Sequence, residues 1–124
     1  MNSKTKKPTK QRKRMHEGGL HTKRKQLVAP IDKKLVTEVG KKKILIRKGD
    51  TVKILVGKHK GKSGKIEKVD YTKCKVYIKD IKCKNNKGQE KLIPFTASNL
   101  ILTEVVLNDS LRIKKTSKTP KKVE

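Results

Sequence analysis

Aromatic residues are nearly absent from this chain, and their scarcity limits the core that it can build. Among 124 residues there is no Trp, one Phe and two Tyr. Hydrophobic residues of all kinds make up only 31% of the sequence. A chain of this length and composition has room for one domain, and that domain must have a small core.

Cysteine is also rare, and its spacing excludes the usual cysteine sites. Cys74 and Cys83 are nine positions apart, with neither a CxxC pair nor a nearby pair of histidines. This spacing is typical of reduced cysteines in an intracellular protein rather than of a zinc site or a disulfide. The three histidines, at positions 16, 21 and 59, stand in basic surroundings that suggest no nucleophile or metal centre. We therefore expect no catalytic residue, no metal and no cofactor.

Acidic residues are few compared with basic ones. The chain has 11 Asp and Glu against 36 Lys and Arg, which gives a formal net charge of +25 and a pI near 10.3. A polyanionic partner is the natural explanation of such a charge. An anionic membrane is the alternative, but the sequence has no amphipathic basic helix and no long apolar stretch. An apolar signal region is missing at the N-terminus, so we expect a cytosolic protein.

Two β-patterned runs in the middle of the chain supply most of its apolar residues. We predict strands over residues 51–56 and 65–70 and a further strand pattern around residues 74–78. The predicted centre of the core is Val52, Ile54, Val56, Cys74, Val76 and Ile78. Ile66 and Val69 are three positions apart, so a β-bulge near Glu67 and Lys68 is needed to bring both inside. Such a bulge bends the strand, as a small barrel requires.

A glycine-rich basic loop separates these two strands. Gly57, Gly61 and Gly64 alternate with His59 and with Lys58, Lys60, Lys62 and Lys65. Glycines permit positive φ and close backbone approach, and successive N–H groups in such turns can converge on an anion. The loop is therefore a candidate phosphate site. A solvated hairpin turn is the alternative.

The segments on either side of the barrel differ strongly in composition. Residues 1–30 hold ten basic residues and one acid, so this arm should be disordered or at most nascently helical until it meets phosphates; the alternative is a solubilising tail. Asp32 and Gly40 predict a helix over residues 33–39. Further predictions are strands over 44–47 and 100–106, a mobile hairpin loop over 82–90, a short helix capped by Asn108 or Asp109 through Ile113, and a fraying basic tail.

The central stretch resembles a known nucleic-acid-binding motif. The residues Lys48-Gly49-Asp50-x-Val52, Gly57, Lys60-Gly61 and Gly64-Lys65-Ile66-x-x-Val69 are similar to a KOW motif. That motif occurs in certain ribosomal proteins and in transcription elongation factors, where it builds part of an SH3-like barrel.

The order of segments along the whole chain narrows the resemblance. Residues 10–13, 20–30, 32–35 and 47–50, with Pro94 and residues 98–100, resemble the universal large-subunit ribosomal proteins of the L-twenty-four family, in its archaeal and eukaryotic branch. The resemblance covers residues from about 4 to 113. It implies a mainly β fold: a small SH3-like barrel with a basic N-terminal extension, short helices and a basic C-terminal tail. The expected domains are an extension over 1–30, a barrel with its leading helix over 31–107, and a helix and tail over 108–124.

The resemblance also implies a function and partners. We expect a structural constituent of the large ribosomal subunit that binds the first domain of its rRNA, helps to initiate assembly, lies near the polypeptide exit tunnel and contacts neighbouring ribosomal proteins. Membrane, small-molecule and homo-oligomeric partners are not expected. The alternatives are a KOW-type transcription elongation factor and a general nucleic-acid-binding or DNA-compacting protein.

The expected mechanism is electrostatic contact with phosphates. The arm would thread between RNA helices, the barrel loops would seat phosphates, and Ser98 and Asn99 could hydrogen-bond the RNA backbone or sugar. Because Lys far outnumbers Arg, base specificity should be weak. The expected rRNA-binding residues are Lys10, Arg12, Lys13, Arg14, His21, Lys23, Arg24, Lys25, Arg47, Lys48, Lys58, His59, Lys60, Gly61, Lys62, Ser98 and Asn99.

Overall fold

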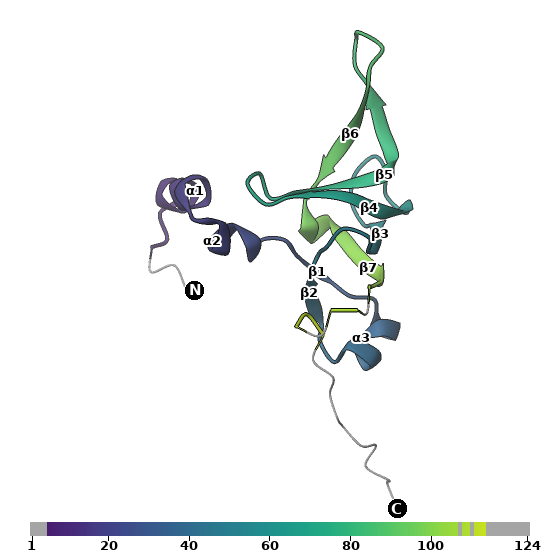
Figure 1. Cartoon of the computed structure of the whole chain (residues 1–124). Helices are drawn as coiled ribbons and strands as arrows, with labels where there is room; N and C mark the ends of the chain where they lie inside the picture. Colours follow the sequence, from purple (N-terminus) through teal and green to yellow (C-terminus); the bar gives the residue numbers. More distant parts are fainter. Residues whose placement is uncertain (1–4, 107, 110, 114–124) are drawn as a thin grey trace, which may run out of the picture.

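The protein is mainly β, as predicted, and its strands form two antiparallel sheets (Figure 1). A computed structural model describes residues 5–106, 108–109 and 111–113. One sheet has two strands, β1 and β2, and the other has five in the order β6-β5-β4-β3-β7. The elements are α1 (Pro8–Glu17), α2 (Leu20–Arg24), β1 (Val28–Pro30), α3 (Lys33–Val39), β2 (Lys43–Leu45), β3 (Thr51–Ile54), β4 (Ser63–Asp70), β5 (Lys75–Lys84), β6 (Glu90–Phe95), the 3-10 helix η1 (Ala97–Asn99) and β7 (Leu100–Glu104).

In the part of the chain described, no helix is long and apolar enough to cross a membrane.

The arrangement of the strands accords with the predicted small barrel. A parallel bridge between Ile31 and Leu102 connects the two sheets. The core takes buried residues from both sheets, such as Ala29 of β1, Ile44 of β2 and Ile54 of β3.

The predicted core is correct at most of its positions. Val52, Ile54, Val76 and Ile78 are buried, in the alternation expected for strands. Val56 is the error, since 61% of it is exposed. β3 ends at Ile54, so the period of two that would have turned Val56 inward no longer applies.

Cys74 lies in the β4–β5 turn rather than in a strand. It is half-buried and packs against the edge of the core, in a left-handed backbone conformation with φ 54°. Cys83 is an exposed residue of β5. The predicted mobile loop over 82–90 is therefore shorter than expected, because Lys82, Cys83 and Lys84 pair with β6.

The predicted bulge in β4 is confirmed. The register with β5 pairs Ile66 with Ile78 but Lys68 with Tyr77, so Glu67 is the extra residue. Ile66 is buried and Val69 packs against the core, as the bulge was expected to allow.

The glycines of the basic loop have two different roles. Gly57 and Gly61 have φ values of 104° and 86°, which ordinary residues rarely adopt. Gly64 is needed for space instead: it is buried in β4, and a Cβ built on it would lie 2.4 Å from Cγ2 of Ile78. Both expected properties are therefore present, but in different residues: Gly57 and Gly61 provide the positive φ, and Gly64 provides the close approach.

Gly64→Ala should therefore destabilise the protein by about 1 to 3 kcal/mol, because Ile78 is buried and cannot move aside without disturbing the core. Gly61→Ala is the matched control, since nothing lies within 4 Å of its added Cβ and only the strain of its φ remains, about 1 kcal/mol. Urea denaturation of both variants measures which substitution lowers the free energy of unfolding more. A smaller effect at Gly64 than at Gly61 would contradict the packing described here.

The arm contains two helices, where the sequence predicts disorder or at most nascent helix. α1 begins with Pro8 in its first turn and has Arg14 and His16 in its last turn, both favourable for a helix. Neither α1 nor α2 has a buried residue, so the core does not depend on either helix. The arm joins the core at Leu27 and Ala29, which are fully buried on either side of Val28.

The helix α3 has the predicted bounds. Gly40 ends it in the left-handed conformation with φ 70°, as expected. Asp32 is at the N-cap position, but its side chain makes no capping hydrogen bond. Its backbone N–H donates to the carbonyl of Leu102 at 2.9 Å, which attaches the start of the helix to β7.

Besides β3, two predicted strands are shorter than expected, and the predicted C-terminal helix is a turn. β2 covers Lys43–Leu45 instead of residues 44–47, and β7 ends at Glu104 instead of Val106. In the described residues 108–109 and 111–113, Asp109 caps a turn: its side chain accepts the N–H of Leu111 at 3.2 Å and its carbonyl accepts the N–H of Ile113. The predicted fraying tail, residues 114–124, lies outside the described residues.

Candidate nucleic-acid interface

A buried ion pair fixes the β2–β3 loop, residues 46–50, which carries two of the expected RNA-binding residues. Asp50 is fully buried and Arg112 is 6% exposed. The guanidinium of Arg112 donates to both carboxylate oxygens of Asp50, at 2.6 and 3.0 Å. The same carboxylate accepts the backbone N–H groups of Arg47 and Val106, at 3.0 and 3.1 Å. The loop is therefore held at both its backbone and its one acidic side chain.

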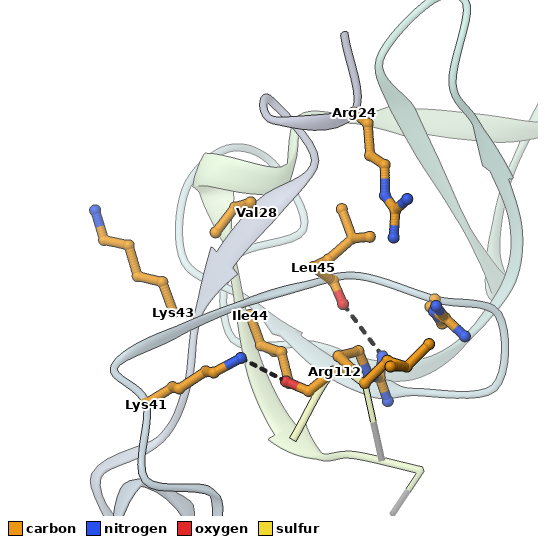
Figure 2. Close-up of a pocket in the computed structure, with 9 residues that line it drawn as sticks. Arg24, Val28, Lys41, Lys43, Ile44, Leu45 and Arg112 are labelled. Atoms are coloured by element: carbon orange, nitrogen blue, oxygen red, sulfur yellow. Dashed lines mark hydrogen bonds between the residues drawn. The ribbon is translucent and has the colours of Figure 1, made fainter. Parts of the chain in front are cut away.

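Arg112 also connects the C-terminal segment to β2. Its guanidinium donates to the carbonyls of Leu45 and Val106, at 3.1 and 3.0 Å. Figure 2 shows this residue in a cavity of about 250 Å³, with Lys41 donating to the Arg112 carbonyl at 2.8 Å. Arg24 lines the same cavity from the arm. The residues that fix the β2–β3 loop thus share a cavity with a cation of the arm.

Three of the expected cations meet in one hollow. Arg24 at the end of α2, with Arg47 and Lys48 of the β2–β3 loop, lines a cavity of about 440 Å³. The fourth lining residue is Tyr71, in the β4–β5 turn. Arg47 also forms an ion pair with Asp109, so part of its charge is already balanced.

The glycine loop between β3 and β4 forms a second group of expected residues with η1. The backbone N–H of Leu55, where the loop starts, donates to the carbonyl of Asn99 at 2.9 Å. The His59 ring meets Phe95 of β6 edge to face, with centroids 6.3 Å apart. Lys58, Lys60 and Lys62 are exposed around this contact, and Ser98 is exposed on η1. The structure thus brings Ser98 and Asn99 to the same end of the sheet as the loop lysines.

The backbone of this loop uses some of its N–H groups within the protein. The N–H groups of Lys60, Gly61 and Lys62 donate to the carbonyls of Gly57, Ile54 and His59, at 2.8 to 3.1 Å. These three donors are satisfied and are not available to an anion. Phosphate contact at the loop would therefore rely on the lysine side chains and on the N–H groups nearer to Gly57, and the anion site that the glycines suggested stays a prediction.

The remaining expected residues lie on the arm. Lys10, Arg12 and Lys13 are exposed on α1, and Arg14 is half-buried. Lys13 pairs loosely with Glu17 at 3.9 Å. His21 and Lys25 are exposed at α2 and just after it, and Lys23 is half-buried there. In Figure 1 the two helices project to one side of the sheets, so these residues extend the charged surface beyond the core.

A thiol contact places α2 beside the β4–β5 turn. The thiol of Cys74 donates to the carbonyl of Lys23 at 3.5 Å, which places the β4–β5 turn beside α2. The turn itself is ordered by Asp70, whose carboxylate accepts the N–H groups of Thr72 and Lys73, both at 3.0 Å. The N–H of Lys73 is the main reason that the pKa of Asp70 lies below its ordinary value.

Three residues of this site were not predicted from the sequence. Tyr71, Asp109 and Arg112 lie outside the basic clusters from which the site was predicted. Arg112 had no local signal, because its partner Asp50 is 62 residues away. Tyr71 had a weak signal, because the chain has only three Phe, Trp and Tyr residues and was expected to bind nucleic acid, in which bases stack on aromatic rings.

The chain matches a family of known proteins over nearly its whole length. The family that comprises the eukaryotic ribosomal proteins L26 and their archaeal counterparts of the L24 type matches residues 5–118, nearly the whole chain. The chain belongs to this family of large-subunit ribosomal proteins.

A curated relative agrees with the family assignment. The large ribosomal subunit protein uL24 of Natronomonas pharaonis is 35% identical over 108 residues, which cover 87% of this chain and 90% of that protein. The predicted family is thus confirmed, as is the prediction of a ribosomal, non-enzymatic protein.

Proposed function

We propose that this chain binds large-subunit rRNA through its arm and loops, and by doing so helps to initiate assembly of the subunit. It binds the first domain of that rRNA, near the polypeptide exit tunnel, beside other large-subunit proteins. The observation that carries the proposal is the hollow in which Arg24, Arg47 and Lys48 converge from two separate segments of the chain.

The charge distribution supports a rigid polyphosphate partner. Cations of the arm, the β2–β3 loop and the β3–β4 loop are mostly exposed. The acids close to the hollow are engaged: Asp50 by Arg112, Asp109 by Arg47, and Asp70 by the N–H groups of Thr72 and Lys73. Exposed cations without nearby free acids attract phosphates and release counterions on binding. The β2–β3 loop is held in place by a buried ion pair, so it loses little freedom when it binds.

The helices of the arm suit the same role. α1 presents cations along a segment that contributes nothing to the core, which leaves it available to contact RNA. Because A-form RNA hides its base edges in a deep groove, such contacts read shape and phosphates rather than sequence. Recognition then depends on how several cationic elements fit one folded RNA.

Separate transcripts of the large-subunit rRNA domains test this proposal. We expect the full chain to form a one-to-one complex with the first domain and to bind it about 10³-fold more tightly than the other domains at moderate salt. Equal affinity for all domain transcripts would contradict the proposal and favour a general nucleic-acid-binding protein. Co-sedimentation of the protein from cells with RNA polymerase instead of large subunits would favour the elongation-factor alternative.

A further inference from the structure

We propose that the hollow formed by α2, the β2–β3 loop and the β4–β5 turn holds one unpaired nucleotide of the bound RNA. The base lies against Tyr71, and its phosphate lies among Arg24, Arg47 and Lys48. This inference rests on the proposed function and specifies the kind of RNA feature that the site takes.

Each wall of the hollow is fixed by hydrogen bonds. The α2 wall lies against Cys74, whose sulfur is 3.5 Å from the Lys23 carbonyl and 3.7 Å from the Tyr71 carbonyl. The β2–β3 wall is held through Gly49, whose N–H donates to the Ile66 carbonyl at 3.0 Å, and through the buried carboxylate of Asp50. The Tyr71 wall is held by the Asp70 turn. The site is therefore formed before any ligand arrives, which reduces the entropy lost on binding.

The lining combines two kinds of chemistry. Three cations surround the space, and Tyr71 is 39% exposed beside them. An exposed aromatic ring next to phosphate-binding cations is the combination that binds single-stranded nucleotides, because the ring stacks on a base while the cations hold the backbone. A bare phosphate would use the cations and leave the ring without a role.

The size of the hollow agrees with a single nucleotide. Its volume of about 440 Å³ lies within the range of small-ligand sites, roughly 300 to 1,000 Å³. A base in a continuous duplex is stacked between its neighbours and cannot reach Tyr71. The ligand is therefore a bulged or looped-out nucleotide.

The experiment measures binding of the full chain to two RNA hairpins that differ only in one bulged 2-aminopurine nucleotide. We expect the bulged hairpin to bind more tightly and its fluorescence to be quenched when the base stacks. Tyr71→Ala should weaken binding of the bulged hairpin by roughly tenfold and abolish the quenching, while binding of the paired hairpin stays the same. Tyr71→Phe keeps the ring and should behave as the wild-type protein.

The outcomes separate this inference from the proposed function. Suppose that both hairpins bind with a steep salt dependence. If the protein then shows no preference for the bulged hairpin, or if Tyr71→Ala weakens binding of both hairpins equally, the nucleotide site is overturned and the proposed function is not. Failure of the wild-type protein to bind either hairpin would also overturn the nucleotide site, while the proposed function is judged separately by binding of the rRNA domain transcripts. Lys48→Ala is the second variant, and we expect it to weaken both hairpins, because it removes a phosphate contact and leaves the ring in place.

Discussion

Asp50→Asn is expected to lower the free energy of unfolding by about 3 to 5 kcal/mol, one of the largest effects of any single change in this chain. The substitution leaves the guanidinium of Arg112 buried without a counter-charge, which is far more costly than losing an exposed pair. Domains of this size are stable by only about 5 to 15 kcal/mol, so a large part of the stability would be lost. Urea denaturation followed by circular dichroism measures the change.

An exposed ion pair of the same chain provides the control. Glu17 and Lys13 lie 3.9 Å apart on α1, with side chains 68% and 70% exposed. Glu17→Gln should change the stability by less than about 0.5 kcal/mol. Combining Asp50→Asn with Arg112→Met removes both charges and should recover part of the loss. An effect of Asp50→Asn no larger than that of Glu17→Gln would show that the buried pair does not hold the loop.

Replacing the four α1 cations with glutamine is expected to weaken binding to the first rRNA domain by about 10²- to 10³-fold, with no loss of folding. The variant changes Lys10, Arg12, Lys13 and Arg14 together. A cation about 4 Å from a phosphate in water contributes about 1 kcal/mol, so four contacts sum to about 4 kcal/mol before screening by salt. Because α1 buries no residue, the thermal midpoint should hardly change. Filter binding at about 0.1 M salt, where screening is moderate, measures the affinity.

A second set of four lysines controls for net charge. Lys33, Lys34, Lys84 and Lys87 are all exposed, and none of them belongs to the expected interface. Their replacement by glutamine removes the same charge from α3 and the β5–β6 hairpin. We expect a loss of less than tenfold. Equal losses in the two variants would mean that total charge, rather than the arm, determines binding.

The mainly β class and most of the core could be predicted because they follow from local patterns. The alternation at Val52 and Ile54, the three-residue spacing of Ile66 and Val69, and Gly40 at the end of α3 each have a mechanism that acts over a few residues. The error at Val56 has the same origin. The alternation continues past the point where β3 loses its partner strand, and periodicity alone does not show where pairing stops.

The features that could not be predicted depend on contacts between distant parts of the chain. Asp50 finds Arg112 only after the C-terminal segment folds back, and Tyr71 meets Arg24 only where the β4–β5 turn packs beside the arm. The N–H groups of the glycine loop were expected to face an anion. Three of them, those of Lys60, Gly61 and Lys62, donate to carbonyls of the protein instead.

The salt dependence of binding tests the central claim most directly, because it counts the phosphates that the protein neutralises. We expect the logarithm of the affinity for the first rRNA domain to fall with the logarithm of salt concentration at a slope of about −6 to −7, for about eight contacts. The α1 glutamine variant should show a slope shallower by about 3, since four of those contacts are gone. A flat salt dependence of the wild-type protein, or the same slope in both proteins, would contradict the account.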